Sequence, residues 1–305
     1  MTIGGVHISA PLTNVAIEYK NPDFIAEKAL PVLPVKKESD KYWIFGRDEL
    51  IRKDDLRAPG APANEVEIAN PTTNTYSCEE HSLKKIVPQR LIDNSDAAIQ
   101  PKSRTTEKLV KMIYLNYEYR TQQLLQSSGN FSSTFAADTY DQYWSDTANV
   151  DIEKQVRHAK ELVLQQSGVI PNTMILNTQT KDYLAIWLRE SSENSYNELV
   201  RGGEFPDRIW GLDIIIGESV YNTAEEGQTE SLSGIWNDNV PIYYRESATP
   251  DLQTLSFGYT FRARDFVTKE WWDNERNGYI IETGFIQQEK IIAAGCGCLI
   301  TNCIE

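Results

Sequence analysis

The stretch of sequence that decides the fold lies near the N-terminus. It reads Asn21-Pro22-Asp23-Phe24-Ile25-Ala26-Glu27-Lys28-Ala29-Leu30-Pro31-Val32-Leu33-Pro34-Val35. Its first part predicts one or two turns of helix. Pro31 and Pro34 then hold their neighbours in extended backbone, because proline lacks an N–H donor and restricts the residue before it. An extended apolar strip without periodic partners needs a surface that is supplied from elsewhere.

Residues 41–88 predict a single long β-hairpin with a loose tip. The outgoing strand begins with Lys41-Tyr42-Trp43-Ile44-Phe45-Gly46, and residues 73–87 form the returning strand. The tip at 57–64 is too rich in Pro, Gly and Ala for a regular element. A two-stranded hairpin is only marginally stable in water, so another surface must cover its apolar face. We therefore expect sister copies to shelter both the arm and the hairpin.

Residues 101–129 predict a long helix. Apolar side chains recur there at helical spacing, at Leu109, Ile113, Tyr117 and Leu124. Ser103 is placed to cap the start, and Gly129 is placed at the C′ position that glycine often occupies. At a rise of about 1.5 Å per residue this helix makes a rod of about 40 Å, which is long for an ordinary globular core.

The rest of the chain alternates helices and strands. A helix is expected at 151–166, with Asp151 as its cap and Gly168 closing it, and another at 180–189. The expected strands are 173–177, 211–217, 235–237, 242–245, 255–261, 266–272 and 278–285, followed by an apolar run at 291–300. The pattern is that of an α+β protein without internal repeats.

Composition argues against several classes of protein. The chain has 305 residues, of which 40% are hydrophobic and 24% charged, as in a soluble protein of about two folded units. Its 30 basic and 44 acidic side chains give a net charge of −14, which disfavours a protein that coats duplex DNA. The run 291–300 is about half as long as a bilayer-spanning helix, and residues 1–7 show no secretion signal.

Acidic side chains concentrate in one segment. Residues 190–240 carry eleven acids and two arginines, a local net charge of 2 − 11 = −9. This indicates either simple solubility or a negatively charged rim that repels nucleic acid and like-charged neighbours.

The histidines and cysteines form no recognisable catalytic or metal-binding motif. They are His7, His81, His158, Cys78, Cys296, Cys298 and Cys303. All four cysteines are interpreted as reduced thiols, and Cys296, Cys298 and Cys303, which lack the paired spacing of a zinc site, as small buried strand residues. The histidines are interpreted as surface residues, and no cofactor or metal is expected.

One segment leaves a carbohydrate-active site open. Trp271-Trp272-Asp273-Asn274-Glu275 places aromatic side chains beside acids, which suits a sugar-binding site or a glycosidase. The alternative, which we favour, is a strand edge followed by a turn at Asn277-Gly278.

The order of these elements resembles the major capsid (coat) protein family of tailed bacteriophages, whose fold is named after phage Hong Kong 97. The resemblance covers nearly the whole chain and is sharpest in 21–35. Further motifs are Ser39-Asp40-Lys41-Tyr42-Trp43-Ile44-Phe45, Arg57-Ala58-Pro59-Gly60-Ala61, Trp144-Ser145-Asp146, Ser167-Gly168-Val169-Ile170-Pro171-Asn172 and Met174-Ile175-Leu176-Asn177.

The resemblance implies a division of the chain. Residues 1–40 would be an N-terminal arm and 41–88 an extended loop lying over an adjacent subunit. Residues 89–172 with 258–305 would form a peripheral domain whose spine helix is 101–129. Residues 173–257 would form an axial α/β domain around the five-fold and six-fold centres.

The resemblance also implies a structural, non-enzymatic function. The chain would assemble with itself, as pentamers and hexamers, into an icosahedral shell that encloses double-stranded DNA without sequence-specific binding. A portal and a separate scaffolding protein are expected partners, no membrane is involved, and assembly is expected in the host cytoplasm before the protein resides in the virion. A nanocompartment shell of the same fold, which would enclose enzymes, is a further alternative.

We expect the contacts between subunits to come from apolar and aromatic side chains of the arm and the loop. These are Phe24, Leu30, Val32, Leu33, Val35, Tyr42, Trp43, Phe45, Arg57, Pro59, Val66 and Ile68.

Overall fold

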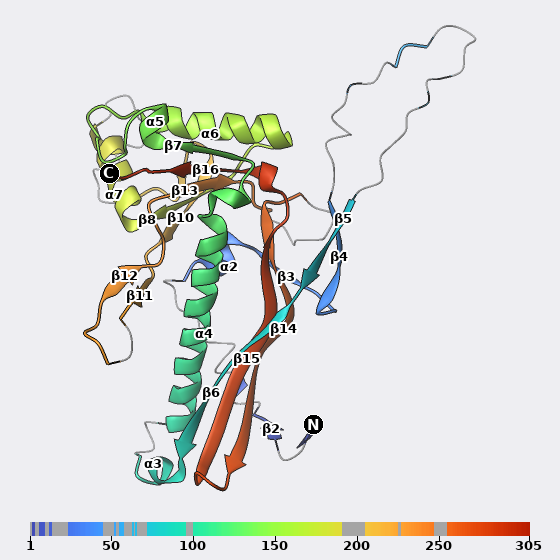
Figure 1. Ribbon diagram of the computed structural model, residues 1–305, viewed down its shortest axis with the longest axis vertical. Coiled ribbons are helices and arrows are strands. Elements are labelled where there is room, and N and C mark those ends of the chain that lie inside the picture. Colours follow the sequence, from blue (N-terminus) through green and yellow to red (C-terminus); the bar gives the residue numbers. More distant parts are fainter. Residues whose placement is uncertain are drawn as a thin grey trace.

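A computed structural model shows an elongated α+β molecule in which one sheet runs alongside a long helix and a second sheet lies at one end of that helix (Figure 1). It describes residues 2–3, 6–9, 12–13, 24–44, 52, 55–57, 63, 65, 72–95, 100–190, 205–224, 227–246 and 255–305. None of the helices in these ranges is both long and apolar enough to span a bilayer.

The first sheet is built around a long antiparallel pair, β14 (Gly258–Asp273) and β15 (Gly278–Ile291). Its order is β1 (Thr2–Ile3), β2 (Val6–Ile8), β14, β15 and β6 (Glu79–Pro88), and β3 (Val32–Pro34) also pairs with β14. The separate strands expected at 255–261 and 266–272 are therefore one strand. Register shifts between Arg262 and Val267 interrupt the sequence pattern while the pairing with β15 continues.

Helix α4 (Pro101–Leu125) packs against one face of this sheet. Leu109, Ile113 and Tyr117 are buried as expected, but the stripe continues through Leu125, while Leu124 is only half-buried. The expected caps are wrong: the first residue is Pro101, preceded by Gln100. The helix ends before Gly129, which lies in the short helix η2 (Ser128–Asn130). There Asn130 Nδ2 donates to the Leu124 carbonyl at 2.9 Å and so satisfies a free helix end.

The second sheet combines strands from distant parts of the chain. Its order is β7 (Ser133–Ala136), β16 (Gly297–Thr301), β13 (Val240–Tyr243), β8 (Thr173–Asn177), β10 (Leu212–Gly217) and β9 (Arg208–Ile209). The predicted strand at 235–237 is wrong, because β12 (Leu232–Gly234) ends before it.

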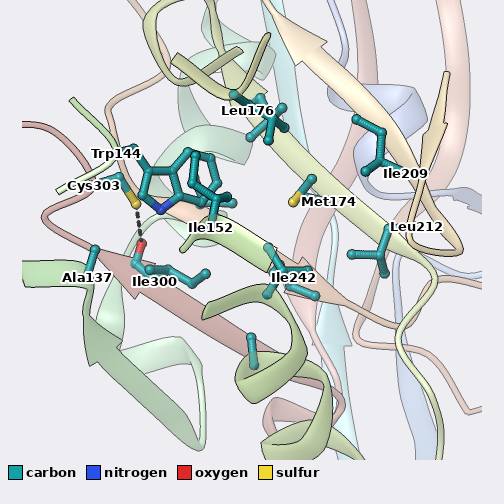
Figure 2. Close-up of a cluster of buried hydrophobic side chains, with 14 of the residues drawn as sticks. Ala137, Trp144, Ile152, Met174, Leu176, Ile209, Leu212, Ile242, Ile300 and Cys303 are labelled. Atoms are coloured by element: carbon teal, nitrogen blue, oxygen red, sulfur yellow. Dashed lines mark hydrogen bonds between the residues drawn. The ribbon is translucent and has the colours of Figure 1, made fainter. Parts of the chain in front are cut away.

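Two helices share the core on one face of the second sheet. They are α6 (Ile152–Ser167) and α7 (Thr178–Glu190), both close to their predicted ranges. Asp151 caps α6 by accepting from the Lys154 N–H at 2.9 Å, and Gly168 ends it in the left-handed conformation, as predicted. Figure 2 shows the core that results, in which Trp144, Met174 and Cys303 are fully buried.

The predicted long hairpin is shorter than expected. β4 (Ser39–Ile44) pairs with β5 (Thr72–Ser77), but after Cys78 the chain leaves this ribbon and β6 pairs with β15 (Figure 1). The prediction of one returning strand at 73–87 is therefore wrong, because its second part joins the edge of the first sheet. The remaining elements are α2 (Ala26–Ala29), α3 (Gln89–Asp93), α5 (Ala137–Tyr140), β11 (Val220–Asn222) and η3 (Ala294–Cys296).

The cysteines at the C-terminal end are buried, as the sequence predicted. Cys296, Cys298 and Cys303 are free thiols, and burial raises the pKa of Cys298 to about 12. Among the described residues, no group of three His, Cys, Asp or Glu side chains is arranged to hold a metal ion.

Candidate functional site

The arm lies at the junction between the two sheets. Ile25, Ala29 and Leu30 share one cluster of buried side chains with Ile175 of β8 and Phe257, which precedes β14. Tyr243 Oη of β13 donates to the Ala29 carbonyl at 2.8 Å, which fixes the end of α2 on the second sheet. The arm is therefore a structural part of this junction.

The extended part of the arm is attached to the first sheet. β3 runs parallel to β14, pairing Val32 with Thr260 and Leu33 with Phe261. The Val35 N–H donates to the Arg262 carbonyl at 2.9 Å, which continues the attachment. The surface that covers the apolar strip is therefore the edge of β14 in the same chain.

A buried acid receives the start of the arm. Glu118 of α4 is fully buried, and its Oε2 accepts hydrogen bonds from the N–H groups of Ile25 at 2.9 Å and Ala26 at 2.7 Å. Its Oε1 accepts from Trp236 Nε1 at 2.7 Å and Ser219 Oγ at 3.3 Å. Burial raises the pKa of the Glu118 carboxyl, and these four hydrogen bonds oppose that rise.

A second polar group joins the arm to the sheet. Arg262, which is largely buried, donates to Glu27 Oε1 in α2 at 2.9 Å and to Gln287 Oε1 in β15 at 2.9 Å. Next to it, the Tyr117 hydroxyl lies 2.8 Å from Thr260 Oγ1 within the core. These contacts tie α2, α4, β14 and β15 together.

The base of the hairpin rests on one aromatic cluster. Tyr76 stacks on Phe261 with ring centroids 4.5 Å apart and an interplanar angle of 4°, and Tyr42 packs on the same ring at 5.7 Å. Tyr42 and Tyr76 are both buried. The ribbon of β4 and β5 is thus attached through its aromatic face to β14.

The predicted contact residues of the arm and hairpin differ in exposure. Leu30, Leu33 and Tyr42 are buried within the subunit. Those that keep some accessible surface are Phe24, Val32 and Val35, which are half-buried, and Arg57, which is exposed. Trp43 lies in β4, while Phe45, Pro59, Val66 and Ile68 lie outside the described residues.

The expectation that the arm and hairpin lack cover of their own is wrong for Leu30, Leu33 and Tyr42. Their cover comes from Tyr243, Phe257 and Phe261, which follow them by about two hundred residues in the sequence. Local sequence patterns do not show such long-range packing. The assignment of subunit contacts itself stays a prediction.

Sequence reasoning missed the polar groups that seat the arm. Glu118 directly follows Tyr117, and both are buried in α4. An acid next to the apolar stripe was the one sequence signal that could have indicated a buried carboxylate. Trp236 and Arg262 carried no comparable signal, because their partners are remote in sequence.

The alternative sugar site forms a strand end and a turn, as we favoured. β14 ends at Asp273, and Asn277 adopts φ 48° just before β15 begins at Gly278. Trp272 is 38% exposed, and its Nε1 donates to Asn274 Oδ1 at 2.8 Å. A Cβ at residue 278 would approach the Val87 carbonyl oxygen to 2.7 Å, so this close crossing requires glycine.

Comparison with known proteins identifies relatives along the whole chain. No protein-family model matches it. It is 28% identical to the major capsid protein of Pseudomonas phage JBD67 over 97% of both chains, and 24% identical to that of Burkholderia phage BcepMu over 95% of both. A phage-related protein from Bordetella bronchiseptica shares its fold, with a TM-score of 0.72 over 97% of both chains at 20% identity. A chain from the capsid of cyanophage P-SCSP1u gives a TM-score of 0.59 at 10% identity, covering 98% of this chain and 91% of that one.

The chain is similar to phage major capsid proteins over almost its whole length, and its fold is of the Hong Kong 97 type. The fold and the resemblance predicted from residues 21–35 and 39–45 are thereby confirmed. The relatives support the role of a phage major capsid protein, a structural protein of the virion. We call the contacts of residues 25–35 with Glu118, Tyr243 and β14 the arm seat. The arm seat joins both sheets, whereas the base of the hairpin is attached to the first sheet only.

Proposed function

We propose that this chain assembles into a closed icosahedral shell of pentamers and hexamers that encloses the double-stranded DNA of a tailed phage. The observation that carries the proposal is the similarity to two phage major capsid proteins, over 97% and 95% of both chains. A portal and a separate scaffolding protein are its expected partners, and assembly takes place in the host cytoplasm.

The proposed division assigns each part of the chain a position in the shell. Residues 1–40 form the arm, 41–88 the extended loop, 89–172 with 258–305 the peripheral domain, and 173–257 the axial domain. Some elements serve two parts: β6 lies in the loop range but pairs with β15, and α6 and β16 pack with axial strands. These contacts join the parts into one subunit.

Subunit contacts in this proposal use the surface that the single chain leaves accessible. Phe24, Val32 and Val35 keep part of their surface exposed along the arm, and Arg57 is exposed in the loop. Trp43, Phe45, Pro59, Val66 and Ile68 complete the proposed set. Leu30, Leu33 and Tyr42 belong to it indirectly, by holding the arm and loop in the shape that a neighbour meets.

Several modest contacts are enough for a shell. A specific interface buries roughly 1,600 Å², and once one contact forms, the others become intramolecular. Closed symmetry then ends the growth that head-to-tail contacts would continue. The net charge of −14 limits adhesion of packaged DNA to the wall.

The test is a deletion of residues 55–70, closed by a short Gly-Ser linker. We expect a folded subunit that no longer closes into shells, because the loop tip is removed while β4 and β5 keep their pairing. Size-exclusion chromatography and negative-stain electron microscopy measure assembly, and far-ultraviolet circular dichroism measures folding. All samples are prepared with the phage's scaffolding protein.

The matched control is Trp272→Ala, an exposed aromatic position at the opposite end of β14. It should assemble like the wild type. Normal particles from the deletion would show that the loop is not an assembly element. Nuclease-protected DNA inside the wild-type particles supports the phage shell, whereas enclosed protein without nucleic acid supports the nanocompartment.

A further inference from the structure

The carboxylate of Glu118 is hydrogen-bonded to two segments of the chain, a different segment through each oxygen. Oε2 binds only the arm, through the N–H groups of Ile25 and Ala26. Oε1 binds only the segment around β11 and β12, through Trp236 Nε1 and Ser219 Oγ. One rigid, planar group therefore connects the arm, the long helix and the segment around β11 and β12.

The partners of Glu118 fix its position closely. All four are uncharged donors, and all four donor residues are themselves buried. A carboxylate buried without a cationic partner depends on its hydrogen bonds, because an unmet charge in the interior is costly. The loss of a donor to one oxygen therefore weakens the hydrogen bonds that the other oxygen accepts, because the carboxylate is no longer fixed in orientation.

The chain makes room for this arrangement at Gly217, the last residue of β10. A Cβ at that position would lie 2.3 Å from Cδ1 of the Trp236 indole, so only glycine lets the ring pass over the strand end. Trp236, which lies between β12 and β13, can thus reach α4. The indole is 4% exposed, so water does not replace its hydrogen bond to Glu118.

We propose that Glu118 is a positioning residue that couples the seat of the arm to the seat of the segment 218–237. When Trp236 and Ser219 hold Oε1, the carboxylate presents Oε2 to the start of α2. When that segment moves, the carboxylate is free to turn, and the two N–H groups of the arm lose the oxygen that accepts from both of them. The coupling is reciprocal, so release of the arm also loosens Trp236. It is a property of the single chain and does not rest on the proposed shell.

Because of this coupling, the attachment of the arm depends on whether Trp236 and Ser219 remain bound to Glu118. The N–H groups of Ile25 and Ala26 donate to Glu118. The Ile25 side chain belongs to the same buried cluster as Trp236, so a change at Trp236 can reach the arm through this packing as well as through the carboxylate. Trp236→Phe keeps an aromatic ring in the cluster, and its combination with Glu118→Gln separates the two routes.

The experiment measures hydrogen exchange by mass spectrometry in the full-length, unassembled subunit. Trp236→Phe removes the indole N–H but keeps an aromatic ring, and we expect exchange in peptides covering residues 24–30 to accelerate about tenfold, as for one lost hydrogen bond to a charged group. Ser219→Ala is a milder second variant, useful if Trp236→Phe does not fold, and should accelerate the same peptides less. Glu118→Gln should accelerate them most.

The matched controls separate coupling from damage. Trp187→Phe removes another indole hydrogen bond, to the Val150 carbonyl at 2.9 Å, in the same sheet region but away from Glu118. Glu107→Gln changes an exposed acid on the same helix. Neither should alter exchange at 24–30.

A double-mutant cycle completes the test. If Glu118 carries the coupling, adding Trp236→Phe to Glu118→Gln should produce no further acceleration at 24–30. Additive effects would overturn the proposal, as would acceleration by Glu118→Gln but not by Trp236→Phe or Ser219→Ala. Equal acceleration throughout α4 and α6 would also overturn it, since that pattern reports a loss of global stability.

Discussion

The arm and the hairpin are attached to neighbouring positions on β14, but by different kinds of contact. The arm residues Ile25 to Val35 enter the core between two sheets and are tied by Glu118, Tyr243 and the parallel pairing of β3. The ribbon of β4 and β5 is held mainly by two tyrosines that pack on Phe261. The arm is therefore part of the fold, whereas we expect the hairpin to detach more readily while the rest of the subunit stays folded.

The difference shows how one chain can combine stability with adaptable contacts. A segment in the core moves only when the core opens, so its accessible side chains are presented at fixed positions. A ribbon attached through one cluster can change its angle at small cost, which suits an element that reaches a neighbour in several local environments. The sequence did not distinguish the two, because both read as apolar segments with few helical or strand partners nearby.

The largest effect is expected where the arm enters the core. Leu30 is fully buried, and its Cδ2 would lie 3.1 Å from a Cβ at residue 258, which shows how tightly it fits. Leu30→Ala should lower the free energy of unfolding by about 3 kcal/mol, the sum of lost burial and a cavity. Urea denaturation followed by tryptophan fluorescence measures this.

The control for this substitution is Leu232→Ala. Leu232 is 70% exposed in β12, so the same chemical change should alter the free energy of unfolding by less than about 0.5 kcal/mol. Equal losses for the two variants would contradict the view that the arm belongs to the core.

A smaller effect is expected at the hairpin. Tyr76 is as buried as many core residues, but Tyr76→Ala should lower the free energy of global unfolding by only about 1 kcal/mol. The reason is that the ribbon can detach, which limits the cost to its own docking energy. Hydrogen exchange should accelerate in 39–44 and 72–77 while the arm stays protected.

Tyr76→Phe, which keeps the ring stacked on Phe261, serves as the matched control and should leave the ribbon protected. A loss for Tyr76→Ala as large as that for Leu30→Ala would mean that the hairpin base folds together with the core. In that case the contrast between the two regions would disappear.

Elements with local signals were predictable from the sequence, and their partners were not. The helix from Asp151 to Gly168 was correct to its caps, because both caps are local chemistry. The end of α4 was missed because Asn130 caps it from outside the helix. The split of the returning strand at Cys78 depends on β15, about two hundred residues away, and no local pattern records that pairing.

The same reasoning applies to the arm seat. Phe24, Val32 and Val35 were selected for being apolar, which does not reveal how much of each stays accessible. Glu118 was passed over because a single acid on a long helix is ordinary until its four donors are known. Burial and hydrogen bonding across the junction are properties of the assembled core.

The smallest effect concerns the outer rim of the arm seat and is a matter of pH. Tyr114 stacks on Phe24 with ring centroids 6.4 Å apart, and burial raises the pKa of Tyr114 to about 12 from its ordinary value near 10. The folded state therefore favours the neutral phenol. Its contribution to stability is complete below pH 10 and is lost as the pH rises toward 12. The absorbance of tyrosinate at 295 nm, taken as the difference between wild type and Tyr114→Phe, should show this delayed ionisation.

Phe24→Ala uncovers the ring and should bring the pKa of Tyr114 back toward 10. An unchanged titration would show that Phe24 does not shield Tyr114 and that the arm contacts this part of α4 only loosely.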